Sequence, residues 1–434
     1  MVTVVHVERT GAGPEGASNP FPHEGSETHA LIRVDNISHI LSAYGAVVAH
    51  AAIASLDLVL DRLRSEACLV RVWRPGLIEV SFGHRSHAEA MALVEALLDG
   101  LSIEAVKIEG LSLHLTLSCA TGGASDEYAL PPYAAAGDDE AWAREYRKAM
   151  HLAAEALAAL REGRLLMGWQ PVRSALSPAE VLYSEGLARL TTSRGRVLSP
   201  SLFIPALEVL GMARVFDRRI VAAVVDELER SPAAILGVNI SSQSARLDAW
   251  WYSLFTRLRQ RPGVAQRLII EITETAPPAP GVSDFVSVLR GYGCRVALDD
   301  FGVGCASVRS AIRIAPDIIK IDGSFVRHPA LFGNNSALLD HLIGVAGAVA
   351  SIVVVEGVQD EGQSRMAADL QKRLTASGGC WQQGHRFGRV SAWRSCRYSQ
   401  KEAESVQTVP LQDLSAPAGD FRAQDWFFPM ACAG

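Results

Sequence analysis

The second half of the chain is a succession of short apolar runs, rich in β-forming residues, that alternate with segments of helical periodicity. The runs are GWQPV, VLYSEGLARL, AILGVNIS, LIIEITE, RVALDDF, IIKID, IVVVEGV and the run around WQQGHRFG. They lack the alternation of half-exposed strands, which indicates strands buried on both faces of a parallel sheet. Eight strands separated by helices over about 230 residues predict a (β/α)8 TIM-like barrel, with residues 164–393 as its bounds.

The first half has another order of elements. The pattern is a strand (LIRVD), a helix from about Ile37 to Leu63, two strands with a turn at Arg74-Pro75-Gly76, a helix from His87 to Leu98 and a strand, LSLHLTLSCA. This β-α-β-β-α-β order predicts a smaller α/β sandwich at residues 28–140. Residues 1–27, rich in Gly, Pro, Ser and Glu, predict a disordered leader. An alanine-rich connecting helix is expected at 141–163, and a C-terminal tail at 394–434.

Composition narrows the classes of function. With 47 acidic and 41 basic residues the net charge is −6, which argues against a broad surface for nucleic-acid polymers. The seven cysteines form no C-x-x-C pair, so reduced thiols are expected rather than disulfides or a zinc site. The start lacks a signal-peptide pattern, and the longest apolar stretch, Leu342 to Val355, is too short to span a membrane. We therefore expect a cytoplasmic protein without a membrane span.

Polar side chains stand at the ends of the predicted barrel strands. They are Glu185, Asn239, Glu271, Asp299, Asp300, Lys320, Glu356 and Gln383. From Asn239 onward they recur about once in each βα unit, so the C-terminal rim of a barrel would bring them to one place. A single acidic residue at a strand end is more often a helix cap or a salt-bridge partner. Six consecutive strands that end in this way favour a functional site.

The chemistry of this set points to metal ions. Carboxylates gathered at one point repel each other unless protons or cations neutralise them. Oxygen ligands with one amide, and no His or Cys, favour Mg²⁺ or Mn²⁺ over zinc. One carboxylate of the neighbouring pair Asp299 and Asp300 could bridge two ions, an arrangement that suits attack of water on a phosphodiester. Lys320 would then place a cation opposite the charge that develops on the phosphoryl group.

The motifs around these residues resemble the EAL-domain family of cyclic di-GMP phosphodiesterases. Glu185-Gly186-Leu187 resembles the Glu-Ala-Leu signature, and the remaining motifs follow in the family order. They are Gln170-Pro171-Val172, Asn239-Ile240-Ser241, Glu271-Ile272-Thr273-Glu274, Asp299-Asp300-Phe301-Gly302, Lys320-Ile321-Asp322, Glu356-Gly357-Val358, Gln383-Gly384 and Phe387-Gly388-Arg389. The resemblance runs from about Arg164 to Val390. It implies a phosphodiesterase that hydrolyses cyclic di-GMP to linear pGpG and so lowers this bacterial second messenger.

The resemblance also implies roles for single residues. A first Mg²⁺ or Mn²⁺ ion would be held by Glu185, Asn239, Glu271 and Asp299, and a second ion by Asp299, Asp300 and Glu356. The catalytic residues implied are Lys320, Glu356, Glu274 and Gln383. Lys320 would position the attacking water or the phosphate, and Glu274 would anchor the loop after the Asp299 strand. Gln170 and Arg189 would bind the substrate, Arg189 through phosphate. A homodimer through the barrel is expected as well.

Three departures from the family pattern keep a second class of function open, a cyclic di-GMP receptor or scaffold that barely hydrolyses the nucleotide. Gly186 replaces the usual alanine, Gln359 replaces a second glutamate, and Val303-Gly304-Cys305 alters the loop after the Asp299 strand. The first half resembles a degenerate GGDEF domain in layout only, because Arg74-Pro75-Gly76-Leu77-Ile78 stands at the signature turn, so no cyclase activity is expected. The tail, with Trp426-Phe427-Phe428, would pack back on the body or dock on a protein partner.

Overall fold

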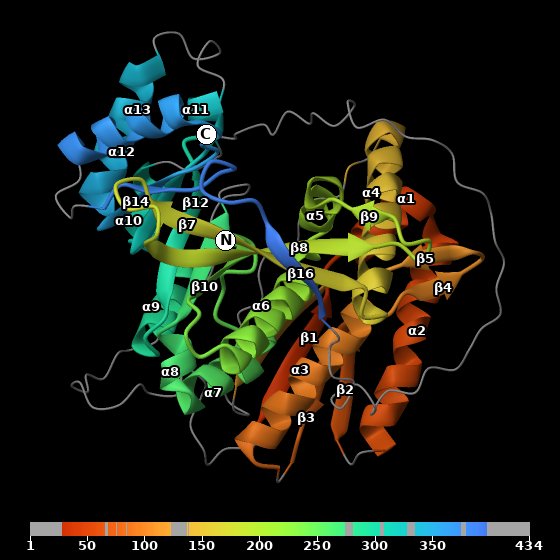
Figure 1. The fold of residues 1–434 in the computed structure, drawn as a ribbon. Helices are drawn as coiled ribbons and strands as arrows, with labels where there is room; N and C mark the ends of the chain where they lie inside the picture. The colour runs from red at the N-terminus through yellow and green to blue at the C-terminus, as the bar shows by residue number, and fades with distance from the viewer. Residues whose placement is uncertain are drawn as a thin grey trace.

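The computed structural model describes residues 28–65, 68–74, 76–83, 85–122, 137, 139–273, 281–303, 308–327, 335–374 and 379–396. The expected leader, most of the expected tail, Glu274 and the loop residues Gly304 and Cys305 lie outside these ranges. Figure 1 shows two bodies side by side. The front domain, residues 28–122, is drawn in red and orange, and the barrel in yellow, green and blue.

The front domain is built on a four-stranded antiparallel sheet in the order β2-β3-β1-β6. Its elements, in chain order, are β1 (His29–Val34), α1 (Ile37–Tyr44), α2 (Ala46–Ser65), β2 (Leu69–Arg74), β3 (Leu77–Ser81), α3 (His87–Ile103), β4 (Val106–Ile108), β5 (Leu111–Leu113) and β6 (Leu117–Gly122). The strand-helix order expected from the sequence is present, with a small β4–β5 hairpin inserted before the last strand.

Two local differences from the sequence expectations have physical causes. The single helix expected after β1 is divided, because Gly45 takes a φ of 89° and ends α1. The expected strand LSLHLTLSCA is divided between β5 and β6. Between them the side chain of Asn36 donates to the carbonyl oxygen of His114 and accepts from the backbone N–H of Thr116, so an amide side chain satisfies groups that a strand partner would otherwise pair.

Helix α4 (Glu140–Arg161) connects the two bodies. Its N-cap is Asp139, whose carboxylate accepts a hydrogen bond from the N–H of Trp142. Its buried face is dominated by alanine, which allows close approach to α1 and to α5 (Pro200–Val209).

Eight strands close into a barrel, as the sequence predicts. They are β7 (Leu165–Ser174), β8 (Val181–Thr191), β10 (Leu236–Ser241), β11 (Leu268–Thr273), β12 (Arg295–Phe301), β13 (Ile318–Ile321), β14 (Ile352–Val355) and β15 (Trp381–Gln382). Neighbours from β8 to β15 are parallel. Strand β7 runs antiparallel to both β8 and β15, which it joins to close the barrel. The expectation of a helix between every pair of strands is wrong at the first pair, because β7 and β8 form a hairpin.

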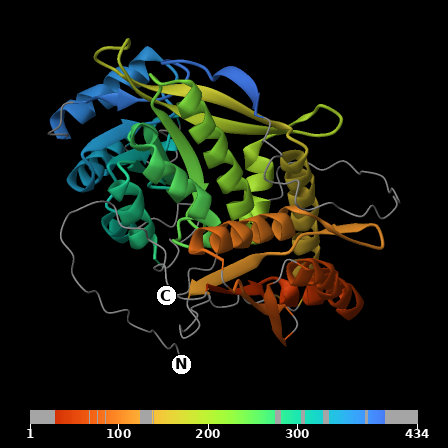
Figure 2. The same cartoon turned by 90° about the horizontal axis from the view of Figure 1, so that it is seen from below.

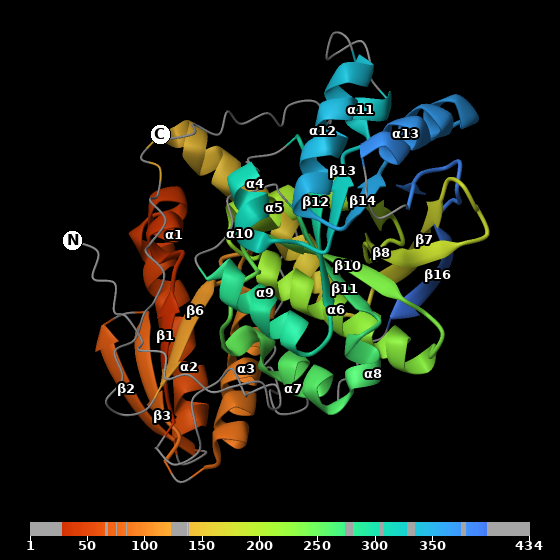
Figure 3. The same cartoon turned by 90° about the vertical axis from the view of Figure 1, so that its left-hand side faces the viewer.

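Helices surround this barrel (Figure 3). Besides α5 they are α6 (Ala213–Arg230), the short 3-10 helix η1 (Ala249–Trp251), α7 (Tyr252–Gln260), α8 (Pro262–Ala265), α9 (Val282–Gly291), α10 (Val308–Ile314), α11 (Ser324–Arg327), α12 (Asn335–Val349) and α13 (Glu361–Leu374). Two further strands extend the sheet, β9 (Val197–Leu198) beside β8 and β16 (Ser391–Cys396) beside β7. Within the described ranges, no helix combines the length and the apolar character that crossing a bilayer requires.

Candidate functional site

The C-terminal ends of the barrel strands surround a cavity of about 310 Å³. Its lining includes Gln170, Glu185, Asp299, Asp300, Arg327, Glu356, Gly357, Gln359, Gln383, Gly384 and His385. Most of the polar residues expected at the strand ends therefore gather at one place. Arg327 and His385 were not predicted as site residues, and Glu274 lies outside the described ranges.

Lys320, on β13, lies beneath the cavity and joins four carboxylates. Its Nζ is 2.6 Å from Glu271 Oε2, 2.8 Å from Glu356 Oε1, 3.1 Å from Asp299 Oδ1 and 3.2 Å from Glu185 Oε2. The side chain is fully buried. Burial alone would lower the pKa of Lys320, but the surrounding carboxylates raise this pKa well above its usual value. This environment favours the charged form of Lys320, and its charge offsets only part of the negative charge around it.

The carboxylates form two groups that share one member. Oxygens of Glu185, Glu271 and Asp299 lie within 4.8 Å of one another, and so do oxygens of Asp299, Asp300 and Glu356. Burial, opposed by Lys320, raises the pKa of Glu271 to about 8 and raises the pKa of Glu356 well above its usual value. Burial and the charge of Asp299 raise the pKa of Asp300 to about 7. Such carboxylates bind protons near neutral pH unless cations stabilise their charged forms.

A backbone irregularity in β12 explains why two consecutive aspartates face one cavity. Side chains of neighbouring residues in a regular strand point to opposite faces. The pairing of β12 with β13 shifts register between Leu298 and Phe301, and Asp300 has a φ of 56°. This bulge turns Asp300 toward the side that Asp299 already occupies, so both carboxylates line the cavity.

Two buried oxygens test whether the residues present suit a metal ion. Asn239 donates through Nδ2 to Glu185 Oε1 at 2.5 Å, and its Oδ1 has no hydrogen-bond partner among the described residues. The same holds for Glu271 Oε1. Gly237 leaves room for this carboxylate, since a Cβ there would stand 2.0 Å from Glu271 Oε1. Free amide and carboxylate oxygens beside two acidic groups form a donor set that fits a hard divalent cation.

Glu185 lies in the middle of β8 and not at its end, which corrects the expectation from the sequence. The strand continues past the barrel rim to Thr191, where it pairs with β9. The side chain is held by Gln383, whose Nε2 donates to Glu185 Oε2 and also approaches Gln170 Oε1 at 3.3 Å. Arg189, four residues further along β8, is half-buried, donates to the carbonyl oxygen of Ala188 and is not among the residues that line the cavity.

Arg327 is the one arginine or lysine among the described residues that line the cavity. Its guanidinium lies over Gly323, because a Cβ on that glycine would be 3.2 Å from Arg327 Cζ and 2.7 Å from the Cα of Gly357. Gly357 directly follows Glu356, so the guanidinium is at the rim beside the second carboxylate group. No residue in the described part of the chain forms a hydrogen bond or ion pair with it. No motif in the sequence singles it out.

The closed barrel and the two carboxylate groups at its strand ends define a class, the barrel proteins with an acidic pocket able to hold metal ions. The family model described as the EAL domain matches residues 153–375. The chain belongs to the EAL domain family. This confirms the resemblance found in the sequence.

Curated relatives carry names that describe one activity. The chain is 29% identical over 218 residues to the "Probable cyclic di-GMP phosphodiesterase PdeA" of Escherichia coli K12, a match that covers 49% of this chain and 29% of the relative. It is 26% identical over 249 residues to the "Cyclic di-GMP phosphodiesterase PdeB" of Shewanella oneidensis, covering 56% of this chain and 28% of the relative. The chain thus spans less than a third of the length of these relatives.

Solved structures in the same family are more distant. An EAL domain protein from Listeria monocytogenes is 21% identical, with a TM-score of 0.46, and the match covers 54% of this chain and 92% of that one. The S helix-GGDEF-EAL portion of Vibrio cholerae LapD, bound to c-di-GMP, is 15% identical with a TM-score of 0.48. That match covers 83% of this chain and 89% of the other.

Proposed function

We propose that this chain hydrolyses cyclic di-GMP to linear pGpG with two Mg²⁺ or Mn²⁺ ions. The observation that carries the proposal is the pair of carboxylate groups that share Asp299 beside one cavity. A shared carboxylate is suited to bridging two ions, and paired ions suit in-line hydrolysis of a phosphodiester. Membership of the EAL family and the names of the relatives support the same activity.

The chain's own residues would divide the work as follows. Glu185, Asn239, Glu271 and Asp299 hold one ion, and Asp299, Asp300 and Glu356 hold the other. When bound, these ions supply Lewis acidity and lower the pKa of a bound water. Gln383 fixes the orientation of Glu185 through its amide.

Lys320 has two parts in the proposal. Its charge keeps the buried carboxylates together, and it steadies the phosphate or the attacking water. Arg327, whose guanidinium has no hydrogen-bond or ion-pair partner among the described residues, binds a phosphate of the substrate. Gln170, which lines the cavity, and Arg189, which does not, also bind substrate. The front domain performs no cyclase chemistry, and the protein works in the cytoplasm.

The test is direct. Purified protein is incubated with cyclic di-GMP and Mg²⁺ or Mn²⁺, and pGpG is measured by chromatography. We expect pGpG from the wild type and none from Glu185→Ala or Asp299→Asn, with unchanged circular dichroism, because each substitution removes a metal ligand and leaves the apolar core intact. Wild-type turnover in either variant would refute the metal assignment.

A receptor that binds cyclic di-GMP without turnover is the second candidate, and position 359 favours it. Gln359 is exposed and lines the cavity, and its backbone N–H donates to Gln363 Oε1 at 2.8 Å. An amide there adds no charge beside the Glu356 group, so the second ion would bind weakly. Gln359→Glu should lower the metal concentration for half-maximal hydrolysis, by a factor within the roughly 10–100-fold range of outer-shell effects. Superimposable metal titrations would show that Gln359 does not limit activity.

The homodimer expected through the barrel has a surface that suits it. Val308 and Ile312, one turn apart on α10, are exposed at 47% and 63%, and Val303, shortly after β12, is exposed at 56%. Arg309 and Arg313 are exposed on the same helix and would rim such a patch. Apolar side chains gathered on a surface and edged by charge are typical of protein interfaces. We propose that a second copy of the chain covers this face.

A further inference from the structure

The front domain and the barrel meet at a buried cluster of charged side chains that the proposed chemistry does not use. Helix α3 presents Glu95 and Asp99, one turn apart, to Arg218 and Arg219 of α6. Arg218 Nη2 lies 2.8 Å from Glu95 Oε1, and its Nη1 lies 2.9 Å from Asp99 Oδ1. Arg219 pairs with Asp99 as well. Glu95 is 4% exposed, and Figure 2 shows α3, in orange, against the green helices of the barrel.

Glu95 also binds the start of the next barrel helix. The backbone N–H of Ser253, in the first turn of α7, donates to Glu95 Oε2 at 3.1 Å, and the Ser253 hydroxyl donates to Oε1 at 2.7 Å. The N-terminus of a helix favours a carboxylate, because its free N–H groups and its dipole are positive there. One front-domain carboxylate therefore connects α6 and α7, the helices that precede and follow β10 in the chain.

Helix α6 is also bonded to the end of β10. Asp217, next to Arg218, accepts from the backbone N–H of Ser241 at 2.9 Å and from the hydroxyl of Ser244 at 2.6 Å. Ser241 is the last residue of β10, two residues after Asn239. Arg218 and Arg219 of α6 thus contact the front domain, and the neighbouring Asp217 contacts the end of β10. That strand carries Asn239, a proposed metal ligand.

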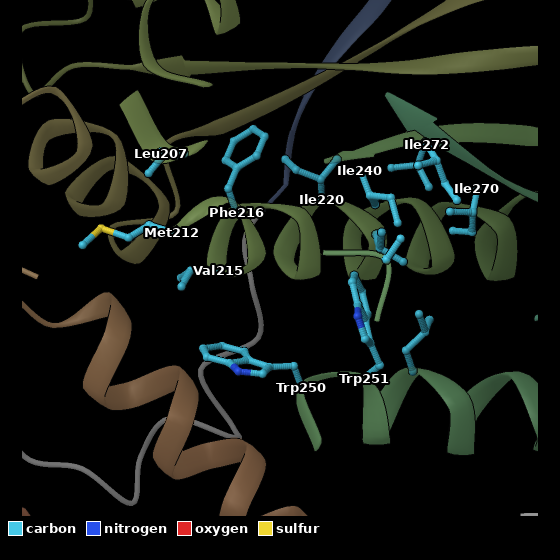
Figure 4. Close-up of a cluster of buried hydrophobic side chains, with 14 of the residues drawn as sticks. Leu207, Met212, Val215, Phe216, Ile220, Ile240, Trp250, Trp251, Ile270 and Ile272 are labelled. Carbon is cyan, nitrogen blue, oxygen red and sulfur yellow. The ribbon is translucent and has the colours of Figure 1, made fainter. Parts of the chain in front are cut away.

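Apolar packing completes the same region. Figure 4 shows Trp250 and Trp251 of η1 beneath α6, with Val215 on the same side of the helix. Both tryptophans are at most 2% exposed, and η1 contacts α3 of the front domain. Trp251 Nε1 donates to the carbonyl oxygen of Ser244 at 2.9 Å. The segment from Ser241 to Ser253 is therefore fixed by both α6 and α3.

We infer that the front domain is a positioning unit for the barrel site, in which Glu95, acting through Arg218 and Ser253, holds the end of β10 and with it Asn239. Glu95 is a positioning residue and touches neither metal nor substrate. This inference rests on the proposed function, because one of its measurements is the hydrolysis of cyclic di-GMP. It gives the front domain a mechanical role in the reaction that needs no nucleotide of its own.

The test is Glu95→Gln in the full chain, which keeps the shape of the side chain and removes its charge. We expect the metal concentration for half-maximal hydrolysis of cyclic di-GMP to rise about tenfold, because small displacements of positioned ligands are costly. We also expect faster hydrogen exchange at the amides between Ser241 and Ser253. If the substitution only reduced the amount of folded protein, the maximal rate would fall, but the metal concentration for half-maximal hydrolysis would stay the same. Arg218→Lys keeps the positive charge, so it should raise the metal concentration for half-maximal hydrolysis less than Glu95→Gln does.

Glu104→Gln is the matched control. Glu104 follows α3 and pairs with Arg161 of α4 at 2.8 Å, not with α6 or α7. The metal concentration for half-maximal hydrolysis and the hydrogen exchange between Ser241 and Ser253 should therefore equal those of the wild type. The inference is overturned if Glu95→Gln also matches the wild type in both measurements. If the wild type itself produces no pGpG, the proposed function fails, and the inference is then decided by hydrogen exchange and by calorimetric Mn²⁺ binding to the same variants.

Discussion

Asp300 combines an unfavourable backbone conformation with a buried charge. A residue with a Cβ enters the left-handed region at a cost of about 1 kcal/mol, and Asp300 does so at a φ of 56°. Its carboxylate is next to that of Asp299, in a largely buried place. Both features are unfavourable for folding and both place a ligand at the cavity. Strain of this kind is common at functional sites.

Asp300 should make the metal-free protein less stable as the pH rises. Its pKa is raised from 3.8 to about 7, first by burial and then by Asp299. Between these two values the folded state holds a proton that the unfolded state has lost, so stability declines from about pH 4 to about pH 7. Asp300→Asn should therefore be more stable than the wild type at pH 8 in a chelator, with the difference vanishing near pH 4. Urea unfolding at both pH values measures this.

The control for Asp300 is Asp369→Asn, at an exposed position on α13 where the carboxylate lies 3.7 Å from Lys372. Surface changes of this kind are usually within about 0.5 kcal/mol. The interpretation fails if Asp300→Asn and the wild type keep one constant difference in unfolding free energy across the pH range.

Arg327→Ala should raise KM for cyclic di-GMP by about tenfold or more, because a hydrogen bond to a charged group contributes about 1.5–3 kcal/mol. The reason is that the guanidinium faces the cavity without a protein partner in the described ranges. The control is Arg365→Ala, since Arg365 is exposed on α13 and pairs with Glu361. Steady-state kinetics at saturating metal measure KM, and an unchanged KM would show that Arg327 does not bind the substrate.

At the scale of elements, the contact of β8 with its neighbours depends on a glycine. A Cβ at Gly186 would stand 2.9 Å from Cζ3 of Trp169, 3.1 Å from the carbonyl oxygen of Gly237 and 3.2 Å from Cγ2 of Val224. Trp169 is on β7 and Val224 on α6, so the glycine lets three elements approach β8. The alanine usual in the family at this position does not fit this chain as it is packed.

Gly186→Ala should destabilise the fold by about 1–3 kcal/mol, the usual cost of overpacking a core. Gly100→Ala is the matched control, since Gly100 is in α3 and a Cβ there meets nothing within 4 Å. That variant should be as stable as the wild type or slightly more stable. Denaturant unfolding of both proteins gives the comparison, and equal free energies would contradict the packing argument.

The sequence predicted the elements better than their directions. Apolar runs located all eight barrel strands, because burial on both faces leaves a continuous apolar signal. The sequence did not predict the hairpin of β7 and β8, since apolar character does not reveal whether a strand runs parallel or antiparallel. The carboxylates were found from their spacing, but the bulge at Asp300 depends on the pairing with β13. The position of Arg327 at the cavity depends on the close approach of Gly323 and Gly357, which no local sequence pattern reveals.

At the scale of the whole molecule, the apolar face of α10 predicts association. Ile312→Glu should convert a dimer into a monomer, because a charge would be buried without a partner in the interface. Light scattering after size exclusion measures the mass. Val197→Glu is the control, since Val197 is 55% exposed on β9, which extends the sheet beside β8. A wild type that is monomeric at high micromolar concentration would contradict the proposal.

The antiparallel strand β7 also has a consequence for synthesis of the chain. Its partners on one side, β15 and β16, lie far downstream, as the contact of Gln170 with Gly388, 218 residues apart, illustrates. Ribosomes add about 5–20 residues per second. One edge of the nascent β7–β8 hairpin therefore stays unpaired for roughly 10–40 seconds, until β15 has been synthesised. An unpaired strand edge can join strands of other chains. During translation this edge is therefore a place where a chaperone would protect the nascent protein until the barrel closes.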